Sequence, residues 1–128
     1  MNDIIQNRAD TWNKRLRVLI TEKEYSQQSF AKDFNKKYGT KCTQKDVSRW
    51  VNVGMRKEEI NPKTGEKETK IIGFPSYQNM ICLADFFNVD VGFLTGETDY
   101  ESFTAERTSN YLGLNQDSVK KETVKKSL

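Results

Sequence analysis

The sequence predicts an all-α domain of five short helices, with one insertion over residues 54–73 that can form a β-hairpin. Apolar residues recur three and four positions apart, as on one face of a helix, and hardly alternate as they would in a strand. Residues that favour helix starts and glycines that favour helix ends bracket these stretches. The 128 residues fit one domain with an appendage. We expect the domain over residues 8–97 and a helical C-terminal extension over residues 98–128.

The first two helices are expected over residues 9–23 and from Ser26 onward. Ser26 is a good N-cap, because its hydroxyl can accept a hydrogen bond from a backbone N–H of the first turn. Gly39 can end the second helix, since glycine adopts the left-handed conformation without a steric penalty. Apolar residues at helical spacing define the buried faces: Trp12, Leu16, Leu19 and Ile20 in the first helix, and Phe30, Ala31 and Phe34 in the second.

The third expected helix, residues 43–51, has two chemically different sides. Thr43 is its N-cap, and Val47, Trp50 and Val51 form one apolar stripe. The remaining side chains can donate hydrogen bonds to base edges and phosphates in a major groove: Gln44, Lys45, Ser48 and Arg49. The helix is therefore a candidate DNA-recognition helix.

The segment 54–73 carries a strong turn signal at residues 61–65, N-P-K-T-G. Proline fixes one backbone dihedral there, and glycine allows a positive φ. The flanks, residues 56–60 and 67–72, can pair as an exposed hairpin. A disordered loop is the alternative, because the flanks are charged and hardly alternate in polarity.

Two more helices are expected after the insertion. Ser76 caps the fourth, and Asn88 ends it. Asp90 caps a short fifth helix over residues 91–95, which Gly96 closes. The core-facing residues of the fourth helix are expected to be Tyr77, Met80, Ile81, Ala84 and Phe87.

Beyond the fifth helix, the C-terminal extension is expected to contain two further helices. They are expected over residues 103–111 and from residue 116 onward, with Gly113 breaking the first and Asn115 capping the second. The basic end, residues 120–126, has too few apolar residues to pack well. This end suggests that the chain is an N-terminal fragment of a longer protein.

Composition narrows the range of functions. Mean hydropathy is −0.81, yet seven Phe, five Tyr and two Trp suffice for one modest core. Net charge is +1 over residues 1–34, +5 over residues 35–72 and −3 over residues 73–128. Basic charge thus gathers around the third helix, as expected of a nucleic-acid binder. An ordinary solvated, lysine-rich surface is the alternative.

The sequence offers little for catalysis or metal binding. It has no histidine, and Cys42 and Cys82 stand apart with no C-x-x-C. We therefore expect buried free thiols, no metal and no cofactor. Without a phosphate-cradling glycine loop or a credible acid pair, we expect no enzyme. The chain also lacks a membrane-length apolar run and a signal-peptide core, so we expect a soluble, cytoplasmic protein and no membrane partner.

Three segments in order resemble the phage repressor/Cro family of helix-turn-helix regulators, also called the xenobiotic-response-element type. Residues 15–31 read R-L-R-V-L-I-T-E-K-E-Y-S-Q-Q-S-F-A, residues 43–50 read T-Q-K-D-V-S-R-W, and residues 74–96 read F-P-S-Y-Q-N-M-I-C-L-A-D-F-F-N-V-D-V-G-F-L-T-G. The resemblance covers most of residues 16–96. It implies a five-helix, lambda-repressor-like helix-turn-helix domain.

The resemblance also implies roles for individual residues. Gln27 would bond the DNA backbone and brace the recognition helix. The base readers would be Gln44, Lys45, Ser48 and Arg49. Separately from the resemblance, we expect DNA-backbone contacts from Thr43 and from Lys36, Lys37 and Lys41. The segment 34–43 is longer than the family norm, and a second helix extended to Tyr38 would explain the extra length.

The insertion is longer than the loop that the family has at this place. It can serve as a wing along the DNA backbone or in the minor groove, as a protein-binding hairpin, or as an inert loop. Five basic residues favour a wing: Arg56, Lys57, Lys63, Lys67 and Lys70. Four acidic residues argue against it: Glu58, Glu59, Glu66 and Glu68.

Together these patterns lead us to expect a sequence-specific regulator of transcription, in particular a repressor from a phage or other mobile element. Its partners would be a double-stranded DNA operator, a second copy of the chain on a palindromic site, and an antirepressor or inducer protein. Such a protein would lie on the bacterial nucleoid. A protein-binding adaptor on the same fold, such as an antitoxin or an antirepressor, is the alternative.

Overall fold

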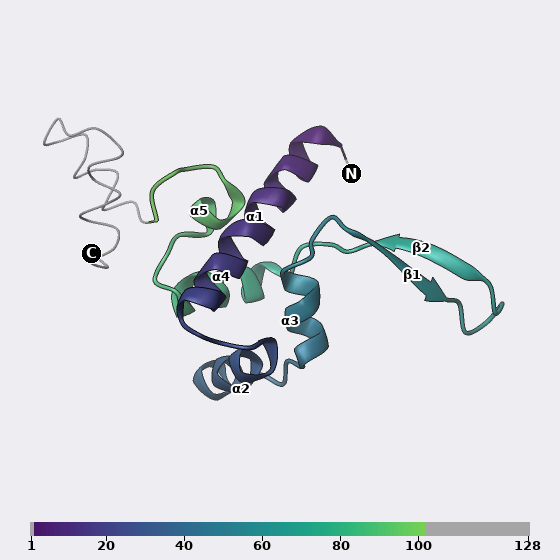
Figure 1. The fold of residues 1–128 in the computed structure, drawn as a ribbon, viewed down its shortest axis with the longest axis horizontal. Helices are drawn as coiled ribbons and strands as arrows, with labels where there is room; N and C mark the ends of the chain where they lie inside the picture. The colour runs from purple at the N-terminus through teal and green to yellow at the C-terminus, as the bar shows by residue number, and fades with distance from the viewer. Residues whose placement is uncertain (1, 102–128) are drawn as a thin grey trace, which may run out of the picture. The chain divides into compact units, whose positions relative to one another are not determined.

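The computed structural model describes residues 2–101 (Figure 1). This part of the chain is mostly helical, with one two-stranded antiparallel sheet. The elements in order are α1 (Asp3–Glu22), α2 (Gln27–Tyr38), α3 (Gln44–Trp50), β1 (Arg56–Ile60), β2 (Lys67–Ile71), α4 (Tyr77–Phe86) and α5 (Val91–Thr95). Backbone contacts divide the chain into two units, residues 1–76 and 77–128. The helices expected over residues 103–111 and from 116 onward lie outside the described residues, and the boundary at residue 98 stays a prediction.

Helix α1 begins earlier than its apolar pattern predicts. Asn2 caps it, since the Asn2 side chain accepts a hydrogen bond from the Ile5 N–H at 2.9 Å. The first turn carries the exposed Ile4 and Ile5, which do not belong to the buried face. That face consists of Ala9, Trp12, Leu16 and Ile20. Leu19, expected in the core, is only half-buried.

Helix α2 agrees closely with the expectation. Ser26 forms a capping box with Ser29, each side chain bonding the other residue's backbone N–H. Gly39 ends the helix at φ +67°, in the left-handed region. The helix runs to Tyr38, so most of the extra length before α3 is continued helix. Its buried face is the predicted one, Phe30, Ala31 and Phe34.

The core of residues 1–76 is rich in aromatic rings. Phe34 lies at its centre, with ring centroids 5.2 Å from Trp50 and 4.9 Å from Tyr38. Trp12 meets Phe74 edge-on at 6.1 Å. Edge-on and tilted pairs of this kind stabilise beyond the area they bury. Trp50, in the apolar stripe of α3, therefore packs against this aromatic core through Phe34.

Strands β1 and β2 pair as the predicted hairpin rather than forming a loop. Arg56 lies opposite Ile71 and Ile60 opposite Lys67. The turn closes through Gly65, whose N–H donates to the Asn61 carbonyl at 2.8 Å and whose φ is +71°. The hairpin extends away from helices α1–α3 (Figure 1).

Gly54 joins α3 to the hairpin. Its N–H donates to the Ile72 carbonyl at 2.7 Å, and its φ is +80°. A β-carbon at this position would lie 3.1 Å from the Ala9 side chain. Only glycine adopts this backbone region without strain.

We therefore expect Gly54→Ala to lower the free energy of unfolding by about 1–2 kcal/mol. Chemical denaturation followed by circular dichroism measures the loss. Gly73→Ala is the matched control, because a β-carbon at Gly73 has no neighbour within 4 Å. Equal stability of the two variants would contradict this role for Gly54.

Residues 77–101 hold α4 and α5. The predicted core face of α4 is wrong in two places, since Tyr77 is 71% exposed and Ile81 45% exposed. Asn88 ends the helical stretch with φ +55°, and Gly96 closes α5 as expected. Asp90 is the N-cap of α5, but its side chain makes no capping hydrogen bond. The buried residues of this unit include Leu83, Ala84, Phe87, Val89, Leu94 and Tyr100.

Among the helices of residues 2–101, none combines the length and the apolar content needed to cross a bilayer. Cys42 and Cys82 are free thiols as expected, but each is half-buried rather than buried.

Candidate nucleic-acid interface

The surface of α3 brings together the four side chains predicted to read bases. Gln44, Lys45 and Arg49 are exposed and Ser48 is half-exposed, while Val47 beneath them is fully buried. The four side chains line one open hollow of about 270 Å³ beside the hairpin. The remaining lining residues are Lys57 and Ile72. Hydrogen-bond donors thus gather on one side of a short helix.

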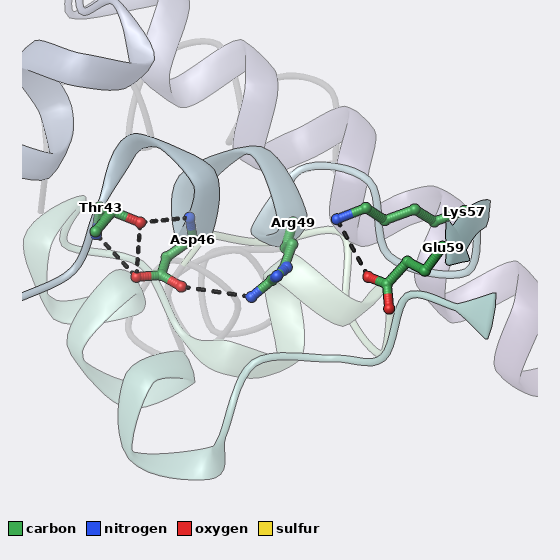
Figure 2. Close-up of polar contacts among 5 residues, drawn as sticks. All are labelled: Thr43, Asp46, Arg49, Lys57 and Glu59. Atoms are coloured by element: carbon green, nitrogen blue, oxygen red, sulfur yellow. Dashed lines mark hydrogen bonds and ion pairs between the residues drawn. The ribbon is translucent and has the colours of Figure 1, made fainter. Parts of the chain in front are cut away.

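The first turn of α3 is held by Thr43 and Asp46 (Figure 2). The Thr43 N–H donates to the Asp46 carboxylate at 2.8 Å, and the Asp46 N–H donates to the Thr43 hydroxyl at 3.3 Å. The same carboxylate lies 3.8 Å from the Arg49 guanidinium. The Thr43 hydroxyl, predicted to contact the DNA backbone, is therefore used within the helix cap. Asp46 orients Arg49 along α3.

Gln27, at the start of α2, bonds directly to Gln44 at the start of α3. The Gln44 side-chain NH₂ donates to the Gln27 carbonyl oxygen at 2.6 Å. This bond uses one N–H of Gln44 and leaves its second N–H and its oxygen pointing from a fixed position. A glutamine amide in that state can pair with the N6 and N7 positions of adenine. The NH₂ group of Gln27 can donate to a neighbouring phosphate.

Helix α1 holds the other end of α3 through side chains that bond the backbone. The Trp12 indole N–H donates to the Trp50 carbonyl at 2.7 Å, and Arg17 donates to the Val51 carbonyl at 3.0 Å. Asn13 pairs with both backbone groups of Val53, donating to the carbonyl at 2.7 Å and accepting from the N–H at 2.8 Å. These contacts satisfy carbonyls that a helix end leaves without partners. Neither Asn13 nor Arg17 was predicted to have this role from the local sequence pattern.

We expect Asn13→Ala to lower the free energy of unfolding by about 1–3 kcal/mol, because it leaves the buried N–H and carbonyl of Val53 without their side-chain hydrogen-bond partner. Thermal unfolding followed by circular dichroism measures the loss. Lys14→Ala, a neighbouring exposed position on the same helix, serves as the control. A loss within 0.5 kcal/mol, roughly that of a surface substitution, would show that Asn13 does not hold this end of α3.

Three lysines predicted to touch the DNA backbone lie around the end of α2. Lys36 and Lys37 are exposed in its last turn, and Lys41 is exposed in the turn that follows. Asn35 fixes this turn: its side chain donates to the Cys42 carbonyl at 2.7 Å and accepts from the Cys42 N–H at 2.8 Å. The three lysines do not line the hollow that holds Gln44, Lys45, Ser48 and Arg49. They form a separate basic group at the opposite end of α2 from Gln27.

The hairpin divides the five predicted wing residues between two faces. Directly opposed residues share a face of a two-stranded sheet. The inner face carries Lys57, Glu59, Glu68 and Lys70, and the outer face carries Arg56, Glu58, Ile60, Lys67, Thr69 and Ile71. Lys63 lies in the turn.

A second open hollow, of about 350 Å³, lies between the inner face and α3. Its lining includes Arg49 and Asp46 of α3 together with Lys57, Glu59 and Lys70 of the hairpin. Arg49 and Lys57 therefore line both hollows beside α3. The polar side of α3 and the inner face form one continuous surface.

The pKa values of Glu59, on this surface, and of Tyr25, between α1 and α2, are both shifted. The hydrogen bond from Lys57 is the main cause that lowers the pKa of Glu59; burial acts in the opposite direction, and the positive charges of Lys57 and Lys70 lower the pKa further. The pKa of the Tyr25 hydroxyl is raised, first by its hydrogen bond to Asp33 and then by burial and the charge of Asp33. Glu59 therefore carries a full negative charge at neutral pH.

Exposed basic and amide side chains line the surface of α3 and the inner face of the hairpin. Within residues 2–101, no three Cys, Asp or Glu side chains gather closely enough to hold a metal ion. Comparisons with protein-family models, curated protein sequences and solved structures find no match to this chain. Function is therefore inferred from the chain's own residues.

Proposed function

We propose that this protein is a sequence-specific, double-stranded DNA-binding regulator of transcription. In this proposal, residues 8–97 form a lambda-repressor-like helix-turn-helix domain, and α3 enters the major groove. The observation that carries the proposal is the two-sided character of α3. Val47 and Trp50 are buried, whereas Gln44, Lys45 and Arg49 are exposed on the opposite side.

The support around α3 favours recognition by a rigid helix. A helix of seven residues is too short to be stable alone. Gln27 bonds its first residue, and α1 bonds the backbone at its end. Donors held in fixed positions discriminate between bases with less loss of conformational entropy. Lys45 and Arg49 suit the O6 and N7 acceptors of guanine.

Charge supports the same proposal. The segment 35–72 has ten basic and five acidic residues, and it includes α3, the hairpin and the lysines around the end of α2. Phosphate contacts from such a segment provide sequence-independent affinity and fix the orientation of a protein on the duplex.

A salt titration tests the proposal. With about six phosphate contacts, affinity for a duplex should fall roughly a thousandfold between 50 and 200 mM salt. Fluorescence anisotropy with a labelled, mixed-sequence duplex measures this slope. Binding that is undetectable at the low-salt end would rule out the proposed function.

The resemblance to the phage repressor/Cro family makes repression of a phage or mobile-element promoter the form of regulation that we propose. Its place of action would be the bacterial cytoplasm, on the nucleoid. A dimer on a palindromic operator would hold two copies of α3 about 34 Å apart, one turn of the duplex. An antirepressor or inducer protein would release it.

One observation favours a second candidate, a protein-binding adaptor. Ile60 and Ile71, at opposite ends of the outer face of the hairpin, are 67% and 47% exposed, and Met55, which precedes β1, is 51% exposed. Exposed aliphatic groups of this kind suit a protein partner. An adaptor would bind duplexes weakly and without sequence preference, so the same titration separates the two functions.

A further inference from the structure

One carboxylate on the inner face of the hairpin holds two lysines. Glu59 lies 3.4 Å from the Lys57 ammonium and 3.5 Å from the Lys70 ammonium, each on a different carboxylate oxygen. Lys57 and Lys70 lie directly opposite each other on β1 and β2. Figure 2 shows the Lys57–Glu59 pair. Glu59 therefore sits where a phosphate with two oxygen acceptors could sit.

Glu68, the other carboxylate of the inner face, has a different partner. It accepts a hydrogen bond from the Asn61 side chain at 2.7 Å and so closes the turn end of the hairpin. Within residues 2–101, Glu59 is the carboxylate that pairs with both inner-face lysines. The two carboxylates, although opposite each other in the strands, thus have separate roles.

The position of Lys57 connects this cluster to α3. Lys57 lines the hollow that holds Gln44, Lys45, Ser48 and Arg49, and also the hollow that holds Glu59 and Lys70. A DNA strand whose bases met α3 would carry its next phosphates toward the inner face. Arg56 and Lys67 of the outer face line neither hollow.

We propose that the Glu59 carboxylate occupies the place of a DNA phosphate between Lys57 and Lys70. The inner face of the hairpin then contacts the DNA backbone only when a phosphate displaces the Glu59 carboxylate from the two lysines. The inference rests on the proposed DNA-binding function. Glu59 lowers affinity for the backbone in two ways: it neutralises two lysines, and it repels the incoming phosphate. The hairpin is then a wing whose affinity for the DNA backbone is set by one acidic residue, Glu59.

Glu59→Gln tests the proposal, because glutamine keeps the size of the side chain and removes its charge. We expect the full-length variant to bind a mixed-sequence duplex roughly two- to thirtyfold more tightly, since two exposed ion pairs no longer compete. Glu58→Gln is the matched control: it removes the same charge one residue away, on the outer face. Less than half of the Glu59→Gln gain is expected from it.

Replacing Lys57 and Lys70 together provides a second test, which measures coupling with Glu59 rather than an increase in DNA affinity. Changing both Lys57 and Lys70 to Ala should weaken binding more in the Glu59→Gln background than in the unaltered chain, because the lysines are available only there. Glu59→Gln should also bind with a steeper dependence on salt, by about 0.9 in slope for each added phosphate contact, and changing both lysines to Ala should abolish this increase. Changing both Arg56 and Lys67 to Ala should produce no such coupling with Glu59.

The outcomes separate this inference from the function on which it rests. If the unaltered protein and Glu59→Gln both fail to bind the duplex at low salt, both proposals are overturned. If the unaltered protein binds but Glu59→Gln and Glu58→Gln raise affinity equally, only the role of Glu59 is overturned. A third outcome is that changing Arg56 and Lys67 to Ala, rather than Lys57 and Lys70, weakens DNA binding more in the Glu59→Gln background. That result would show that the outer face of the hairpin faces the DNA, and it would also overturn the proposal.

Discussion

Trp12→Ala is expected to lower the free energy of unfolding by about 3–5 kcal/mol, the largest loss that we expect from any single change in this chain. Trp12 is fully buried, and its ring meets Phe74 edge-on. Its indole N–H also satisfies the Trp50 carbonyl at the end of α3. The substitution removes a large apolar volume and a hydrogen bond together, so the cavity and the unpaired carbonyl add to each other.

A second substitution separates these two effects. Trp12→Phe retains much of the apolar ring but leaves the Trp50 carbonyl without its donor, so we expect a smaller loss of about 1–3 kcal/mol. Val18→Ala, at an exposed position on α1, is the control and should change stability by no more than about 0.5 kcal/mol. Urea denaturation followed by circular dichroism compares all three. If Trp12→Phe were as stable as the unaltered protein, the bond to α3 would contribute nothing.

Gln44→Ala is expected to weaken binding to the preferred duplex by about 1–3 kcal/mol, or roughly 5- to 150-fold. The substitution removes a side chain that Gln27 holds in one orientation at the start of α3. A lost pair of hydrogen bonds to one base affects only duplexes that carry that base. Preference at one position of the site should therefore relax, while affinity for mixed-sequence DNA changes little.

Gln28→Ala is the control for this prediction, since Gln28 is an exposed glutamine next to Gln27 on α2. It should leave both affinities within about twofold, as expected for a surface position away from the bases. Equal losses on preferred and mixed-sequence duplexes in Gln44→Ala would mean that Gln44 contacts the backbone rather than a base.

Local signals in the sequence were sufficient for much of the fold. Ser26, Thr43 and Gly39 mark the helix ends where the structure has them, because caps depend on residues close in the chain. Local periodicity failed at α4, where Tyr77 and Ile81 match a helical stripe and are nonetheless exposed. Which face of an amphipathic helix is buried depends on its tertiary neighbours.

The candidate site was predictable in its exposed donors but not in their supports. The polar side of α3 follows from the buried stripe of Val47 and Trp50, so its residues could be named from the pattern. The partners Asn13 and Glu59 could not, because their bonds join elements distant in the chain or depend on the register of the hairpin. For the same reason the wing residues could be named, but not assigned to two faces.

Selection of bound duplexes from a random pool tests most directly whether α3 reads a DNA sequence. The full-length protein, at low salt, should enrich a defined motif, and Gln44→Ala should lose the preference at one position of that motif. A motif with two half-sites about one helical turn apart would support the dimer as well. Recovery of a pool with no enriched sequence would contradict recognition by α3.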